Sequence, residues 1–298
     1  MAALPLSLPL RRRAGLEPAA RSALRSVVAS PKFELVPLKN AIDQAAFLPP
    51  GALVSVTASP AKGMDATIEL SVRLRERGYV VVPHLSAHMI RDRAHLAELL
   101  RRMADGGVDR AFVVGGDAED PGDFRDGLSL VRAIADLGHH LTEIGVPCYP
   151  QGHPSIPDGA LLSALAAKAP LVDYMTTQMC FDPAAIGSWL RARRAEGLGL
   201  PVVIGVPGVA EPHKLLTIAT RIGVADSRRF VAKNARFIAR LVRSGGFYRP
   251  TGLLESLAPL MADPAAGVHG IHLYTFNAVE ATEGWRLRYL ETLDGRRS

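Results

Sequence analysis

The stretch RAFVVGGD, residues 110–117, decides the fold of this 298-residue chain. Four apolar residues, 111–114, run directly into two glycines and an aspartate. A short continuous apolar run is typical of a strand that is buried on both faces of a parallel sheet. The glycines end the strand and let backbone or ligand approach closely. Asp117 then follows the C-terminal end of a buried strand, where parallel α/β proteins hold their chemistry. A solvated turn after the strand is the alternative.

The same pattern recurs along the chain. Apolar segments lie near residues 33, 53, 80, 111, 146, 173, 202 and 271, and helical segments separate most of them. Eight such units predict an α/β fold, a single-domain (β/α)8 TIM barrel. The first two strands lie too close together for a full helix between them. The alternative, a doubly wound open sheet, would normally carry GxGxxG after its first strand, and that motif is absent from the sequence.

Domain organisation follows from this count. We expect residues 1–30 to form an N-terminal arm or helix, and residues 31–298 to form the catalytic barrel. The first thirty residues are rich in Arg, Ala and Leu and hold one acid, Glu17. This composition resembles a transit peptide, but the whole chain shares the bias, which favours an ordinary helix.

Composition and charge narrow the class of protein. Hydrophobic residues make up 48% of the chain and charged residues 21%, as in soluble globular proteins. The formal net charge of +6 comes without a run that interleaves arginine with aromatics, which argues against nucleic-acid binding. No stretch reaches the eighteen apolar residues of a membrane span. Cys148 and Cys180 lie in apolar runs, which indicates buried thiols in a reducing, cytoplasmic compartment.

Polar residues recur at the strand ends, and each could also be an ordinary core or loop residue. They are Glu34, Thr57, His84, Gly116, Asp117, Tyr149, Gln178 and Tyr274. Together they suit a flat heteroaromatic ligand and a proton transfer. A metal site is not predicted, because the remaining histidines lack carboxylates at ligand spacing. Among them, His269 and His272 flank the start of the last strand, so we expect them at the wrong end of the barrel for chemistry.

Eight short motifs resemble the methylenetetrahydrofolate reductase family, which consists of flavin-dependent (β/α)8 barrels, in its short bacterial form. In chain order they are FELVP (33–37), VSVT (54–57), PHL (83–85), GGD (115–117), YPQGHP (149–154), TQMCFD (177–182), PGV (207–209) and HLYTFN (272–277). Each is short, but the series keeps the family's order over nearly the whole predicted barrel.

The resemblance implies a reaction and its cofactors. FAD would bind in the barrel mouth and take hydride from NADH or NADPH. 5,10-Methylenetetrahydrofolate would then be reduced to 5-methyltetrahydrofolate, which feeds methyl groups toward methionine. By match, Glu34 is the general acid, and Asp117 lies against the pterin and flavin. Gln178, Tyr274 and Phe276 would bind the folate. FAD would be held by Thr57, His84, Gly116, Asp117, Tyr149, His153 and, with a small gap in the match, Lys168.

The sequence also departs from the family pattern. Gly115 stands where the family has an arginine that contacts FAD phosphates, and Ala278 stands where an arginine helps to hold the folate tail. The candidate replacements are Lys62, Arg191 and Arg286. These departures keep two alternatives open. One is an oxidative enzyme of the same family with weak flavin binding, and the other is a non-catalytic barrel that binds folate or a nucleotide. A homo-oligomer also stays open.

Overall fold

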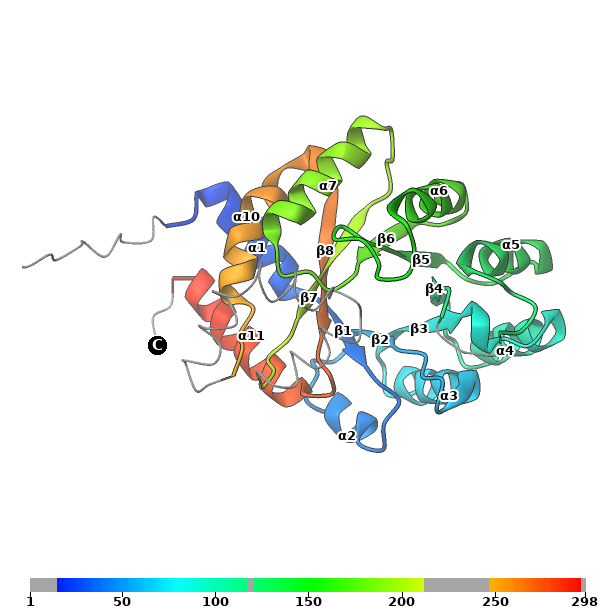
Figure 1. Cartoon of the computed structure of the whole chain (residues 1–298). Coiled ribbons are helices and arrows are strands. Elements are labelled where there is room, and N and C mark those ends of the chain that lie inside the picture. Colours follow the sequence, from blue (N-terminus) through cyan, green and yellow to red (C-terminus); the bar gives the residue numbers. More distant parts are fainter. Residues whose placement is uncertain (1–14, 117–120, 212–246, 296–298) are drawn as a thin grey trace, which may run out of the picture.

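Eight parallel strands close into one barrel in the computed structural model, which describes residues 15–116, 121–211 and 247–295 (Figure 1). Each strand pairs with its neighbours in sequence, and β1 pairs with β8 to complete the ring. The strands are β1 Lys32–Leu35, β2 Leu53–Val56, β3 Val80–Ser86, β4 Arg110–Val114, β5 Glu143–Cys148, β6 Tyr174–Thr177, β7 Val202–Pro207 and β8 Val268–Tyr274. The predicted (β/α)8 barrel is therefore confirmed.

Helices surround the strands on the outside of the barrel (Figure 1). They are α1 Pro18–Ala29, α2 Ala41–Ala45, α3 Gly63–Arg75, α4 Arg93–Asp105, α5 Gly127–Leu137, α6 Asp158–Lys168, α7 Pro183–Ala195, α10 Thr251–Ala262 and α11 Val279–Leu293. Short 3-10 turns lie at Ala87–Met89, Ala169–Leu171 and Pro264–Ala266. The brevity of α2 confirms that the first two strands leave no room for a full helix. The helices expected over residues 213–222 and 228–244 lie outside the described residues.

Acidic residues mark the beginnings of three of these helices. The carboxylate of Asp92 accepts a hydrogen bond from the backbone N–H of His95, and Asp126 accepts one from that of Ser129. Asp182 caps α7 in the same way, with Pro183 at the first helical position. Such caps satisfy N–H groups that have no partner within the helix, so the sequence itself sets where these helices begin.

The strands divide their residues between two cores. Phe33 and Leu35 of β1 belong to the large apolar core between barrel and helices. Their neighbours Lys32 and Glu34 are equally buried but contact groups on β6 and β8 across the barrel interior. Because successive residues of a strand face opposite sides, β1 places two ionisable groups inside the barrel.

Two glycines leave room for tyrosine rings inside the barrel. A Cβ atom on Gly145 would lie 2.2 Å from Cζ of Tyr174, and one on Gly205 would lie 2.7 Å from Cε2 of Tyr274. Both glycines lie within strands, where any larger residue would displace the ring. They therefore fix the positions of the two tyrosines.

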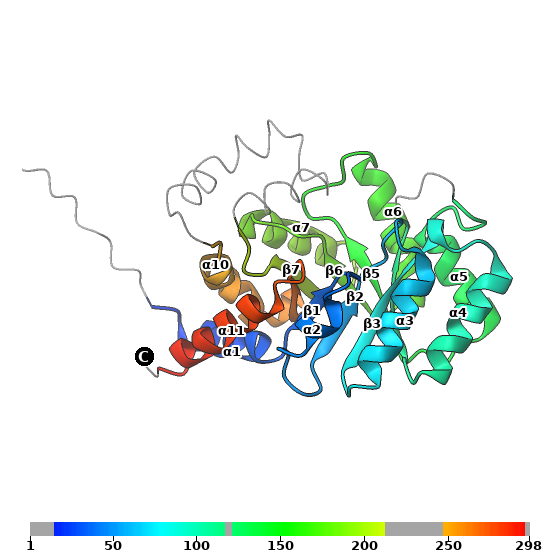
Figure 2. The same ribbon diagram turned by 90° about the horizontal axis from the view of Figure 1, so that it is seen from below.

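Helix α1 packs against α10 and α11 on one side of the barrel (Figures 1 and 2). The buried guanidinium of Arg286 on α11 forks onto the carboxylate of Glu283, at 2.6 and 2.7 Å, and donates to the carbonyls of Val28 and Ala29. Arg286 thus joins α11 to the end of α1. This placement corrects the expectation that Arg286 could replace a ligand-binding arginine.

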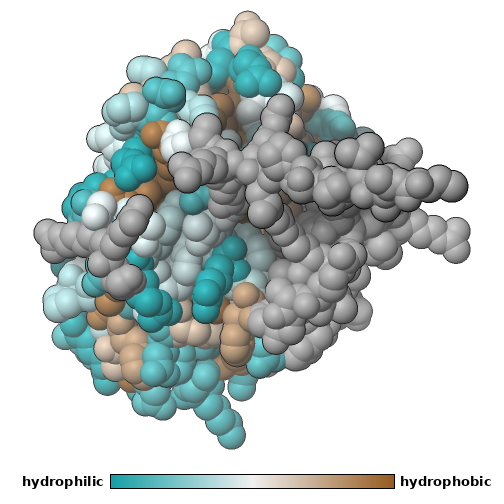
Figure 3. All heavy atoms as spheres, turned by 90° about the vertical axis from the view of Figure 1, so that its left-hand side faces the viewer, coloured by the Kyte–Doolittle hydropathy of each residue, from teal (hydrophilic) through white to brown (hydrophobic). Residues whose placement is uncertain are grey.

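The remaining features concern the surface, the helices and the two cysteines. Hydrophilic and hydrophobic residues are intermixed on the described part of the face shown in Figure 3. None of the helices in the described ranges has the length and apolar character needed to cross a bilayer. Cys148 and Cys180 are buried, as their apolar surroundings predicted, and they are not joined in a disulfide.

Candidate active site

A carboxyl–imidazole pair lies at the centre of the candidate site. Oε2 of Glu34 on β1 lies 3.2 Å from Nε2 of His272 on β8, and both side chains are buried. Burial raises the pKa of Glu34 from 4.5 to about 7, because the charged form is poorly solvated there. Burial also lowers the pKa of His272 well below its ordinary value, and the charge of Lys32 adds to this effect. A protonated acid beside a neutral imidazole is therefore available near neutral pH.

A second histidine lines the same interior. Nε2 of His84 on β3 lies 2.7 Å from Oγ of Ser55 on β2, and its ring lies 4.8 Å from that of Phe112, centroid to centroid. Burial lowers the pKa of His84 to about 4, although the nearby Glu34 opposes the shift. Because both histidines are neutral, neither supplies a strong cationic partner that would force Glu34 to ionise.

A lysine and an ion pair occupy the level below Glu34. Nζ of Lys32 lies 2.6 Å from the hydroxyl of Tyr174 and 4.1 Å from the centroid of its ring. Burial lowers the pKa of Lys32 to about 8. Arg110 and Glu143 form a half-buried ion pair at 2.7 Å across β4 and β5. The N-terminal half of the barrel interior thus holds charged groups. Glu34, which is uncharged when protonated, lies on the C-terminal side of them.

The β6–β8 side of the mouth carries Tyr274 and Gln178. The hydroxyl of Tyr274 donates to the carbonyl of Thr177 at 3.1 Å, and its ring lies 4.6 Å from that of His272. The backbone N–H of Gln178 donates to the carbonyl of Cys148, and its side chain is partly exposed. The structure therefore brings Tyr274 to the Glu34–His272 pair and places Gln178 just beyond the end of β6.

The turn after β4 requires glycine at one position and leaves space at the other. Gly116 has φ +98°, and a Cβ there would lie 2.1 Å from Oγ of Ser86. A Cβ on Gly115 would meet no described atom within 4 Å. Gly116 is thus needed for close backbone packing, while Gly115 opens a space beside it. Asp117, the predicted second carboxylate, lies outside the described residues.

The remaining predicted cofactor residues fall into separate places. Thr57 directly follows β2, and its backbone N–H donates to the carbonyl of Leu35. Tyr149 follows β5, and its ring meets that of His153 edge-on, 5.4 Å apart. Lys168 lies at the end of α6 and is buried, which lowers the pKa of its ammonium group. The group of Glu34, His84, His272 and Tyr274 is called the Glu34 cluster. The structure does not bring Lys168 into contact with it.

The segment after β8 has an unusual backbone conformation. Phe276 and Asn277 have φ values of +52° and +58°, which side-chain-bearing residues rarely adopt. The amide of Asn277 offsets this strain, because Oδ1 accepts from the N–H of Val36 and Nδ2 donates to its carbonyl, at 2.8 and 2.9 Å. Asn277 thereby joins the loops after β8 and β1.

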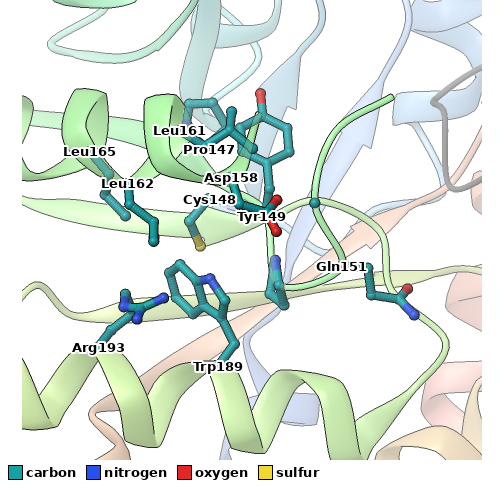
Figure 4. Close-up of a pocket in the computed structure, with 12 residues that line it drawn as sticks. Pro147, Cys148, Tyr149, Gln151, Asp158, Leu161, Leu162, Leu165, Trp189 and Arg193 are labelled. Carbon is teal, nitrogen blue, oxygen red and sulfur yellow. The ribbon is translucent and has the colours of Figure 1, made fainter. Parts of the chain in front are cut away.

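A cavity of about 270 Å³ lies beside the end of β5, between α6 and α7. Leu161, Leu162 and Leu165 of α6 lie across it from Trp189 and Arg193 of α7 (Figure 4). Its lining includes Tyr149 but none of the residues of the Glu34 cluster. We therefore treat it as a neighbouring feature and not as the site of chemistry.

A scan against protein-family models matches residues 28–284 to methylenetetrahydrofolate reductase. The chain belongs to the methylenetetrahydrofolate reductase family. Family membership makes it an oxidoreductase of folate metabolism. The match begins before β1 and ends within α11, so it covers the whole ring of strands in this reductase-family barrel.

Two solved structures from Burkholderia cenocepacia J2315 are similar to this reductase-family chain at low identity. One, named as a phosphonomutase, is 15% identical with a TM-score of 0.46, and the match covers 93% of this chain and 98% of that one. The other, named as a lyase or mutase, is 17% identical with a TM-score of 0.47, and covers 93% and 88%. Similarities this distant carry no argument about the reductase-family site.

One residue of the site contradicts the sequence-based expectation. His272 lies in the interior of β8, not at its start, because the strand begins at Val268. His269 is exposed, as expected of a residue near the N-terminal end of the strand. The signal that could have identified His272 was its spacing of two residues from Tyr274, which puts both side chains on the same face of the strand.

Proposed function

We propose that the protein reduces 5,10-methylenetetrahydrofolate to 5-methyltetrahydrofolate with NADH or NADPH and FAD. The observation that carries the proposal is Glu34, a buried acid with a pKa of about 7 inside the barrel. Family membership gives the substrate class, and this carboxyl gives the chemistry that the substrate needs. The product would supply methyl groups toward methionine, and residues 31–298 would act as one catalytic domain.

Glu34 acts as the general acid in this proposal. A ring nitrogen of the folate must accept a proton when its bond to the one-carbon unit breaks, leaving a reactive iminium. An acid with a pKa near the working pH is partly protonated and can still transfer its proton, which is the optimum for this role. The neutral imidazoles of His84 and His272 preserve that state, because a cation at either position would favour the carboxylate.

The residues near the ends of β2 to β5 suit FAD in part. The glycine pair 115–116 leaves backbone bare beside an open space, and His84 and Tyr149 are partly exposed. With these, Thr57, Gly116, His153 and Lys168 would hold the cofactor. When bound, FAD supplies a hydride acceptor that nicotinamide can reduce and folate can oxidise. We also propose that Asp117, as a carboxylate, stabilises the cationic iminium.

The test separates the acid from the redox steps. In Glu34→Gln, oxidation of NADH with menadione as acceptor should continue at the wild-type rate, because no proton from Glu34 is needed. NADH oxidation with 5,10-methylenetetrahydrofolate as the acceptor should fall by about 10²-fold or more, since general acid catalysis contributes that much. Glu143→Gln, at the half-buried acid of β5 that pairs with Arg110, is the matched control and should retain both activities. An equal loss of both activities in Glu34→Gln would assign Glu34 a structural role.

A second candidate keeps the family and reverses the reaction. Gly115 favours it, because no side chain occupies the position where the family carries an arginine for the FAD phosphates. Such an enzyme would oxidise 5-methyltetrahydrofolate with weakly held flavin. Initial rates in both directions, measured with and without added FAD, discriminate between the two candidates.

A further inference from the structure

The contact between Glu34 and His272 orients the acid as well as enclosing it. The two residues lie on the first and last strands of the barrel, and their side chains are 8% and 4% exposed. Oε2 of Glu34 is the oxygen that faces the imidazole, at 3.2 Å from Nε2. The other oxygen, Oε1, makes no hydrogen bond to any residue in the described ranges.

The surroundings of His272 indicate which nitrogen carries its proton. Its Nδ1 is buried and has no hydrogen-bond partner among the described residues. A buried N–H without a partner is rarer than a buried acceptor without one, so Nδ1 is best read as the bare acceptor. The imidazole is neutral because of its burial and the nearby Lys32. The remaining proton therefore lies on Nε2, which donates to Oε2 of Glu34.

This hydrogen bond distinguishes the two carboxyl oxygens. An oxygen that accepts from Nε2–H is disfavoured as the site of the acid proton, so the proton lies on Oε1. The titratable groups that face the pair are Lys32 on β1, His84 on β3 and Tyr274 on β8. Among the described residues, none of these groups makes a hydrogen bond to Oε1, which leaves that oxygen for a ligand in the mouth.

We propose that His272 is a positioning residue that holds Oε2 of Glu34 and thereby directs the acid proton on Oε1 toward the folate. The proposal rests on the proposed function and deepens it. Loss of the donor would let the carboxyl turn, so that either oxygen could carry the proton. It would also remove a hydrogen bond that favours the ionised form, and the carboxyl should then titrate at higher pH.

The experiment uses two variants of His272. His272→Phe keeps a ring without a donor, whereas His272→Gln places an amide N–H at a reach similar to that of Nε2. The first readout is the carboxyl ¹³C titration of Glu34 in Glu-labelled protein, assigned by its loss in Glu34→Gln. The midpoint should rise by about one to two pH units in His272→Phe, which is the effect expected for losing a hydrogen bond to a charged group. It should return close to the wild-type value in His272→Gln.

The second readout is the split between the two activities. NADH oxidation with 5,10-methylenetetrahydrofolate as the acceptor should fall about tenfold or more in His272→Phe and recover in His272→Gln. Oxidation of NADH with menadione should be the same in both. His95→Gln is the matched control, because His95 is a buried histidine on α4, outside the barrel. It should change neither readout.

Two results would overturn the proposal. One is a Glu34 titration that is unchanged in His272→Phe, and the other is an equal shift in the Phe and Gln variants, which would show only a packing role. If His272→Phe does not fold, His272→Asn replaces it, because its amide is one methylene shorter than that of Gln. Wild-type behaviour in His272→Asn would then reject the proposal. The titration needs no folate activity, so it stays readable even if the proposed reaction fails.

Discussion

Glu34 should make the stability of this protein fall as pH rises through the neutral range. In the unfolded chain the carboxyl has an ordinary pKa of 4.5, and in the folded protein burial raises it to about 7. Between these two values the folded state binds more protons than the unfolded state, so unfolding becomes easier with rising pH. Below pH 4.5 both states are protonated, and above pH 7 both are ionised, so the effect is confined to that window.

The size of the effect follows from the shift of about 2.5 units. At about 1.4 kcal/mol per unit, the full difference in the free energy of unfolding is about 3.5 kcal/mol. Linkage for a single group places about 2.5 kcal/mol of it between pH 5 and pH 8. Glu34 is 6% exposed, so solvent screening reduces this value little.

Glu34→Gln isolates this contribution, because the amide does not titrate. Urea unfolding of wild type and variant, followed by circular dichroism at pH 5 and pH 8, gives the two free energies at each pH. The variant should gain about 2.5 kcal/mol relative to wild type over that interval. A difference that stays constant with pH would show that the folded protein does not hold this carboxyl in its protonated form, and the general-acid assignment would fail with it.

Two further substitutions test the packing that positions the site. Gly116→Ala should destabilise the fold by about 1–3 kcal/mol, because residue 116 has a φ of +98° and the new Cβ would meet Ser86. The neighbouring Gly115→Ala should be nearly neutral. Equal urea midpoints for the two variants would contradict this reasoning. Arg286→Met should cost about 3–5 kcal/mol, because it leaves the buried carboxylate of Glu283 unpaired. Arg101→Met breaks a pair with Glu98 at the same spacing. Because that pair is exposed, it should cost much less than Arg286→Met, and similar thermal shifts in the two variants would refute the distinction.

The fold was predictable because its signals are local. Each buried strand is a short apolar run, and glycine, proline or a capping acid marks many of the boundaries. Asp182–Pro183, for example, predicts the beginning of α7 at the residue where the structure has it. Such signals need no knowledge of distant contacts, so eight strands in order were enough to indicate a closed barrel.

The candidate site was predictable only in part, because its contacts join distant segments. The apolar run around Glu34 left an inward and a solvent-facing carboxyl both open, and its partner lies 238 residues away. His272 was placed beside the start of the last strand, because strand boundaries are poorly defined by sequence. Lys168 was included only through a family match with a gap, and its place at the end of α6 leaves its part in holding FAD a proposal. The role of Asn277 was not visible at all, because it depends on a backbone conformation that no pattern in the sequence predicts.

The acid at the centre of the site exists only when the barrel is closed. Lys32 and Phe33 of β1 pair with His272 and Leu273 of β8, and this pairing is what brings Glu34 and His272 together. Without the pairing to β8, β1 would be an open edge, and water reaching Glu34 would return its pKa toward the ordinary value. The amide of Asn277 joins the loops that follow the same two strands, so it holds the closure at the site itself. The energetic penalty of burying an uncharged acid is therefore coupled to the pairing of β1 with β8, where the ring closes.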